Sequence, residues 1–275
     1  MQLYRDLRVL TARPGPEEEA QAPHHLYGVA DAAEAWSVGK WLTAATAALA
    51  GVAARSRPAI VAGGTGLYFR ALTDGLAHIP AVPGEVRRLA GETFDRLGEA
   101  AFRLQLRDRD PAAEARIAPG DRQRLARAWE VYETTGRPLS DWQRATASPF
   151  PASAFRRVLL EPPRAELYVR CDSRVLTMAA SGALEEVRTL VARGLDPALP
   201  GMKAVGLREF AGCLAGKTTL DEAIAAAQQA TRHYAKRQMT WFRRQTPDWP
   251  RIVDEASRQS WIDHECAALP ALTLR

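Results

Sequence analysis

The stretch Ala59-Ile60-Val61-Ala62-Gly63-Gly64-Thr65-Gly66-Leu67-Tyr68-Phe69-Arg70-Ala71-Leu72 decides the fold that we expect. It opens with a short apolar run containing β-branched Ile60 and Val61, the composition of a strand buried on both faces. After the glycines, apolar residues recur at the spacing of one helical face; they are Leu67, Tyr68, Ala71 and Leu72. We therefore predict a buried strand, a glycine turn and a helix, in that order.

The turn formed by Gly63, Gly64, Thr65 and Gly66 is a candidate anion site. A turn of this kind places free backbone N–H groups and the positive end of a helix at the carboxyl edge of a parallel sheet. The glycines allow a phosphate group to approach the backbone, and the Thr65 hydroxyl can donate to one of its oxygens. Glycine-rich loops are weak signals, so an ordinary strand-to-helix turn without a ligand explains the same residues equally well.

The composition indicates a globular protein with an anionic partner. The 275 residues are 47% hydrophobic and 25% charged, enough to bury the core of one large domain or two smaller ones. The net charge of +5 favours nucleic acid or a phosphorylated metabolite. The three cysteines are far apart, and no apolar run approaches the roughly 20 residues that a bilayer requires. We therefore expect a cytoplasmic protein that does not contact the membrane.

A helical insertion is predicted at residues 83–149. Residues 84–107 and 121–135 are amphipathic, and the second helix is closed by Gly136. Between them, Asp110 can cap a shorter helix. No strand pattern occurs in this part of the sequence.

Residues 1–82 and 150–249 are predicted to form an α/β core around the parallel sheet. A strand at 156–160 returns to that sheet after the insertion. Helices are expected at 34–55, 164–180, 183–193 and 203–215, and from Leu220 to about Arg244 behind a capping box that starts at Thr219. Residues 250–275 show little organisation and are interpreted as a loose tail.

Basic residues gather on four of the predicted elements. Residues 231–244 carry five Lys or Arg and no acidic residue, with Trp241 and Phe242 among them. Cations interleaved with aromatic residues suit a nucleic-acid backbone beside unstacked bases. A solvated basic face with both aromatic residues in the core is the alternative. The other clusters are 122–127, 168–174 and Arg87-Arg88. Four clusters on separate elements favour one extended anionic ligand.

A series of motifs, taken in order, closely resembles the tRNA dimethylallyltransferases, also called tRNA isopentenyltransferases, over roughly residues 1–249. The motifs are Met1-Gln2-Leu3-Tyr4-Arg5, Pro23-His24-His25-Leu26, Gly63-Gly64-Thr65-Gly66-Leu67-Tyr68, Asp110-Pro111 with Ala115-Arg116-Ile117, Asp121-Arg122-Gln123-Arg124 with Glu130-Val131-Tyr132 and Thr135-Gly136, Leu167-Tyr168-Val169-Arg170 with Arg174 and Met178, Val205-Gly206, and Thr231 to Arg243.

The resemblance implies a P-loop kinase-like parallel sheet with a helical insertion that grips the anticodon stem-loop of tRNA. The implied reaction moves the dimethylallyl group of dimethylallyl diphosphate to the exocyclic amine of the adenosine just 3′ of the anticodon, with Mg²⁺ as cofactor, in a monomer. A neutral adenine amine is a poor nucleophile, so cations, Mg²⁺ and backbone donors must stabilise the departing diphosphate. The base must also be flipped out of its stack.

The resemblance assigns roles residue by residue. Thr65 and Arg87 are the implied catalytic residues. The implied diphosphate-binding residues are Gly63, Gly64, Thr65, Gly66, Arg170 and Arg174. The implied tRNA-binding residues are Met1, Gln2, Gln123, Arg124, Leu125, Ala126, Arg127, Lys203, Arg208, Lys236, Arg237, Gln238, Thr240, Trp241 and Arg243. Met1 and Gln2 belong to the segment that recognises the flipped adenosine, and no residue is assigned to a metal.

The chain departs from the family pattern at its beginning. The family opens with a strand and a P-loop resembling G-P-T-x-S-G-K-[ST], and its general-base aspartate precedes the Met-Gln pair by two positions. Neither is present before Met1, so we expect the chain as given to be inactive. Either the gene product starts upstream and the chain is a fragment, or it is a degenerate copy. The intact motifs favour the first account. A tRNA-binding protein without catalysis is the alternative function.

Overall fold

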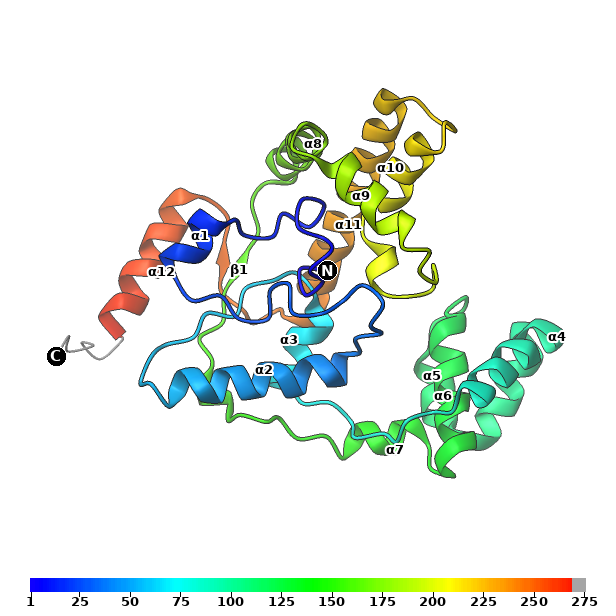
Figure 1. Ribbon diagram of the computed structural model, residues 1–275. Helices are drawn as coiled ribbons and strands as arrows, with labels where there is room; N and C mark the ends of the chain where they lie inside the picture. Colours follow the sequence, from blue (N-terminus) through cyan, green and yellow to red (C-terminus); the bar gives the residue numbers. More distant parts are fainter. Residues whose placement is uncertain (269–275) are drawn as a thin grey trace. The chain divides into compact units, whose positions relative to one another are not determined.

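The computed structural model describes residues 1–268, which are mostly helical (Figure 1). The chain separates into two compact units. One consists of Met1–Tyr68 with Phe155–Arg275, and we call it the core unit; the other is Phe69–Ala154, the insertion unit. The expected sheet-based core is therefore replaced, in the part of the chain that is described, by helices with a small amount of parallel β-structure.

The insertion unit is built mainly from four consecutive helices, of which the sequence predicts the first three. They are α4 (Gly84–Arg109), α5 (Pro111–Arg116), α6 (Arg122–Thr135) and α7 (Leu139–Arg144). A short 3-10 helix, η1 (Ala152–Ala154), follows them. Their apolar faces meet in one cluster of Ala90, Phe102, Leu106, Ala113, Ile117, Leu125, Ala128, Trp129, Val131 and Leu139. The bounds predicted for 84–107 and 121–135 are confirmed to within two residues at each end. Helix α4 is kinked at Gly98, which has a non-helical φ of 74° and ψ of 166°, so the prediction of one continuous helix there is only partly confirmed.

Local signals end and begin these helices where the sequence predicts. Gly136 closes α6 in the left-handed region, with φ of 65°. Asp110 caps α5, because its carboxylate accepts the backbone N–H of Ala113 at 2.9 Å. The same fully buried carboxylate accepts the backbone N–H of Ser140 at 2.9 Å. Asp110 therefore joins the start of α5 to the start of α7.

The core unit contains α1 (Pro16–Gln21), α2 (Val38–Ala53) and the beginning of α3 (Gly66–Thr73) in its first part. Its second part contains α8 (Arg164–Ala180), α9 (Ala183–Ala192), η2 (Gly201–Lys203), α10 (Leu207–Leu214), α11 (Leu220–Gln245) and α12 (Glu255–Ala268). Helix α11 packs against α8 and α10, and α10 packs against α9 (Figure 1). The predicted capping box is confirmed, since Thr219 and Glu222 exchange hydrogen bonds at the start of α11.

Parallel pairing in the core unit involves only short segments of residues 1–268. Strand β1 (Leu159–Leu160) pairs with β2 (Arg251–Ile252), and Tyr4 forms a parallel bridge with Ala30. The predicted strand at 156–160 is present but reduced to its last two residues. The interpretation of 250–275 as a loose tail is wrong for residues 251–268, which supply β2 and α12. Residues 269–275 lie outside the described part of the chain.

The predicted buried strand at 59–62 is also wrong. Residues 57–63 have irregular backbone, and the side chains of Ile60 and Val61 are 94% and 37% exposed. A strand buried on both faces needs neighbouring strands to pair its N–H and C=O groups. Nothing in residues 1–268 forms a strand beside this segment. Apolar composition therefore indicated the wrong local structure here.

Candidate functional site

The glycine turn is held by two side chains of α11. The side-chain amide of Gln238 donates to the carbonyl oxygen of Gly64 at 3.1 Å. The indole of Trp241 packs against Gly66 so closely that a Cβ at this position would lie 2.1 Å from Cε3 of the ring. Gln238 and Trp241 are three residues apart and share a helical face. The packing of α11 therefore explains the glycines at 64 and 66 without a ligand.

Helix α3 starts directly at this turn. The backbone N–H of Tyr68 donates to the carbonyl of Thr65 at 2.9 Å, and the Thr65 side chain is exposed. The Tyr68 ring stacks on Trp41 of α2, with ring centroids 4.4 Å apart. Burial raises the pKa of Tyr68, so its phenol is neutral at physiological pH. The first turn of α3 thus has a fixed direction, with Thr65 at its solvent-facing end.

The same helix α11 displays the predicted cations. Lys236, Arg237 and Arg243 are exposed, as is Thr240. Arg243 forms an ion pair with Glu161 at 3.0 Å, and Arg251 contacts the same carboxylate at 2.6 Å. Although burial opposes ionisation of Glu161, the hydrogen bonds from the two guanidinium groups lower its pKa. One carboxylate shared by two arginines leaves a net positive charge at this end of α11.

Four further predicted cations lie on other parts of the core unit. Arg170 and Arg174 are exposed on α8, and Arg170 is paired with Glu166. Lys203 at the end of η2 and Arg208 in α10 are also exposed. Each side chain is accessible to an anion in solution, and their roles stay predictions.

The basic cluster at residues 122–127 of α6 is only partly accessible to solvent. Gln123 and Arg124 are exposed, and Arg127 is half-buried with an ion pair to Glu130 at 3.3 Å. Leu125 is 0% exposed, and Ala126 packs against the buried cluster of the unit. The 3.6-residue period of α6 turns the Leu125 side chain into the core, so a contact between Leu125 and tRNA stays a prediction.

The two predicted catalytic residues belong to different units. Thr65 lies in the core unit, whereas Arg87 is exposed on α4 of the insertion unit. Their action on one diphosphate stays a prediction.

The amide of Gln2 is held by a turn that sequence analysis does not single out. Its Nε2 donates to the carbonyl oxygens of Thr11 and Ala12, both at 3.1 Å. Ala12 has a positive φ of 47°, and the Gln2 carbonyl accepts the N–H of Gly28 at 2.9 Å. Because both amide hydrogens are engaged, Oε1 is the group of Gln2 that can accept a hydrogen bond from a ligand.

Residues 1–268 contain neither a candidate metal cluster nor a helix that could span a membrane. No group of three His, Cys, Asp or Glu in this range could hold a metal ion. Within the same range, every helix is too short or too polar to cross a bilayer.

Comparisons with known proteins agree on one family. A family model described as IPP transferase matches residues 2–245. The tRNA dimethylallyltransferase of Phenylobacterium zucineum is 61% identical over 262 residues, which are 95% of this chain and 84% of that protein. The tRNA dimethylallyltransferase of Caulobacter sp. strain K31 is 58% identical over 252 residues, with 92% of this chain and 82% of that protein covered.

Solved structures show the same similarity. The tRNA isopentenylpyrophosphate transferase of Bacillus halodurans matches with a TM-score of 0.66 and 30% identity, over 97% of this chain and 84% of that chain. A eukaryotic dimethylallyltransferase acting on tRNA matches with a TM-score of 0.78 over 100% of this chain and 73% of that chain. At 23% identity, this second match shows the fold alone.

Proposed function

Because this chain belongs to the IPP transferase family, we propose that it transfers the dimethylallyl group of dimethylallyl diphosphate to the exocyclic amine of the adenosine 3′ to the anticodon in tRNA. The observation that carries the proposal is the double role of α11. Its Gln238 and Trp241 hold the glycine turn, while its Lys236, Arg237 and Arg243 face solvent. One helix thus links a candidate diphosphate site to a candidate tRNA surface.

The transfer needs a stabilised leaving group. The bond between the allylic carbon and the diphosphate oxygen breaks, and the electron pair leaves with diphosphate. The adenine nitrogen bonds to the carbon and passes a proton to water. In the proposal, the Thr65 hydroxyl and the backbone N–H groups at the start of α3 donate to the diphosphate. Arg170 and Arg174 of α8 contribute positive charge.

The tRNA is bound through its phosphates and through the extruded base. Exposed Arg124, Lys203, Arg208, Lys236 and Arg237 suit phosphate contacts, which position the RNA without reading its sequence. The segment containing Met1 and Gln2 is proposed to contact the flipped adenosine. Gln238 and Trp241 act in this proposal through the glycine turn that they contact, instead of through direct contacts with RNA.

Mg²⁺ is the cofactor that the family resemblance implies. The glycine turn offers one side-chain oxygen, that of Thr65, and no carboxylate. Mg²⁺ usually binds through one or two carboxylates together with substrate phosphates and several waters. These residues do not form a resident Mg²⁺ site, and each proposed step is assigned to groups of the protein alone.

The test is a transfer assay with radiolabelled dimethylallyl diphosphate and anticodon stem-loop RNA. We expect label in RNA that has adenosine 3′ to the anticodon and none when guanosine replaces it. Absence of label from both RNAs would instead support the expectation, drawn from the missing P-loop motif, that the chain as given is inactive. The variant Thr65→Ala should lose about 100- to 1,000-fold in kcat/KM. The matched control is Thr43→Ala on α2, an exposed threonine that should leave kcat/KM unchanged.

Binding of tRNA without catalysis is the second candidate, favoured by the exposed cations alone. Filter binding of the same RNA separates it from the first. Affinity should fall steeply with salt, and Lys236→Ala should reduce the slope of log K against log salt by about 1. Tight, salt-dependent binding of the RNA with no transfer at saturating dimethylallyl diphosphate would support the second candidate and contradict the first.

A further inference from the structure

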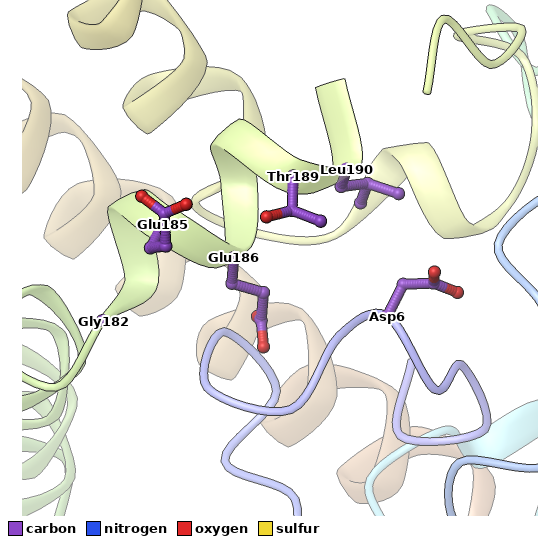
Figure 2. Close-up of a pocket in the computed structure, with 6 residues that line it drawn as sticks. All are labelled: Asp6, Gly182, Glu185, Glu186, Thr189 and Leu190. Atoms are coloured by element: carbon purple, nitrogen blue, oxygen red, sulfur yellow. The ribbon is translucent and has the colours of Figure 1, made fainter. Parts of the chain in front are cut away.

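A carboxylate on α9 holds the backbone of the N-terminal segment. Glu186 accepts the backbone N–H groups of Arg8 and Val9 on Oε2, at 2.6 and 2.7 Å, and that of Leu10 on Oε1, at 2.9 Å. Figure 2 shows Glu186 directed toward this segment, whereas the adjacent Glu185 points away from it. Hydrogen bonds from backbone N–H groups to an ionised carboxylate are among the stronger ones in proteins. Residues 8–10 are therefore held by a partner about 180 residues away in sequence.

Just beyond the C-terminal end of the same helix, a guanidinium binds the neighbouring part of the segment. Arg193 pairs with Asp6 at 2.5 Å and with Asp31 at 2.6 Å. Asp6 in turn accepts the backbone N–H of Ala32 at 2.9 Å. The N–H of Ala33 and the guanidinium of Arg193 lower the pKa of Asp31, so this carboxylate is ionised near neutral pH. Glu186 and Arg193 thus attach the segment to α9 at two places.

The position of Gln2 depends on this attachment. Thr11 and Ala12, whose carbonyl oxygens accept both hydrogens of the Gln2 amide, directly follow the residues that Glu186 holds. The Thr11 hydroxyl donates to the carbonyl of Leu7 at 2.6 Å, which closes the turn around residues 8–10. A change in the path of residues 8–10 would move both carbonyls and rotate the Gln2 amide with them.

We propose that Glu186 is a positioning residue that sets the orientation of the Gln2 amide toward the extruded adenosine. This inference rests on the proposed function, since that function brings the base to Gln2. With Nε2 engaged, Oε1 of Gln2 accepts an N–H of the adenine edge and opposes the carbonyl oxygen that guanine has at the same place. Glu186 acts through the segment and touches no substrate.

The first test compares Glu186→Ala and Glu186→Gln in the full chain with the control Glu185→Ala. Glu185 is the neighbouring exposed carboxylate and pairs with Arg188, three residues away, at 2.5 Å. Glu186→Ala should raise KM for the adenosine stem-loop about tenfold, as expected for the loss of one net charged hydrogen-bond interaction. KM for dimethylallyl diphosphate should stay within about twofold of the wild-type value. Glu186→Gln should recover part of the loss, because its carbonyl oxygen still accepts.

The second test is a double-mutant cycle with Gln2→Ala. If Glu186 acts through Gln2, Glu186→Ala should change KM for RNA by less than about twofold once Gln2 is absent. Independent losses that add in the double variant would overturn the proposal. So would equal increases in KM for both substrates, because these would indicate a general structural defect.

A third measurement separates this inference from the proposed function. The side-chain amide signals of Gln2 and the exchange rates of the amides of residues 8–10 can be followed by NMR without any substrate. Both should change in Glu186→Ala and stay constant in Glu185→Ala, and unchanged Gln2 signals would overturn the positioning role. Absence of transfer by the wild-type chain, with these changes present, would contradict the proposed function alone.

Discussion

The insertion unit and the segment before α3 both contain large apolar side chains, but these side chains differ in how exposed they are to solvent. In the insertion unit, Phe102 and Leu106 are fully buried. In the segment before α3, Ile60 is 94% exposed. A helix satisfies its backbone hydrogen bonds within itself, so an apolar stripe needs only a second stripe to cover it. A strand has to find neighbouring strands first. Apolar periodicity is therefore a safer guide to helices than an apolar run is to strands.

The largest expected effect on stability is a difference between these two regions. Phe102→Ala should lower the free energy of unfolding by about 3–5 kcal/mol, because it leaves a cavity among α4 and α6. Ile60→Ala should change it by less than about 0.5 kcal/mol, because the side chain is already in water. Urea unfolding followed by circular dichroism measures both. A loss at Ile60 comparable with that at Phe102 would mean that residues 59–62 are buried in solution.

The next effect concerns the polar part of the insertion core. Asp110→Ala removes the acceptor for the buried N–H groups of Ala113 and Ser140, and should cost about 2–3 kcal/mol. Asp108→Ala, at an exposed position of the same helix end, should be nearly neutral. The same unfolding experiment provides the comparison. Equal effects of the two variants would show that Asp110 does not join α5 to α7.

A smaller effect tests how the glycine turn is held. Gly66→Ala should cost about 1–3 kcal/mol, because the added methyl group meets the indole of Trp241. The matched control is Gly84→Ala at the first position of α4, where an added Cβ meets no atom within 4 Å. Combining Gly66→Ala with Trp241→Ala should reduce the cost of the added methyl group. If it does not, another constraint requires the glycine.

The smallest effect tests whether ion pairs hold the irregular backbone of the core unit. Hydrogen bonds from Lys40, from the N–H of Asp31 and from the Trp36 ring lower the pKa of Glu34 from 4.5 to about 2. A carboxyl group whose pKa falls on folding adds stability above its unfolded pKa and loses it as the pH drops. The difference in unfolding midpoint between wild type and Glu34→Gln should be constant above about pH 5 and vanish near pH 2.

The control for this pH experiment is Glu19→Gln on α1. Glu19 is an exposed glutamate, and Glu19→Gln should show the same dependence of the unfolding midpoint on pH as the wild type. A Glu34→Gln profile that runs parallel to the wild-type profile down to pH 2 would contradict the role of the hydrogen bonds to Glu34.

Sequence analysis succeeded where a local interaction sets the structure. Thr219 and Glu222 indicate the start of α11, and Gly136 indicates the end of α6, because each of these residues makes its hydrogen bonds within one helical turn. It did not separate exposed from buried positions in the basic motif of α6, where helical geometry places the Leu125 side chain in the core. It also failed at residues 251–268, since β2 depends on a partner strand about 90 residues earlier.

The sequence by itself determined the longer helices before residue 250, several of their caps and the family, because these depend on residues close together in the chain or on motifs in order. Only the tertiary structure decided that Gly66 meets Trp241, that Gln238 binds Gly64, and that Glu186 holds residues 8–10. These partners lie about 170 to 180 residues apart. Such contacts follow from how helices pack around a shared core, and no local pattern in either partner announces them.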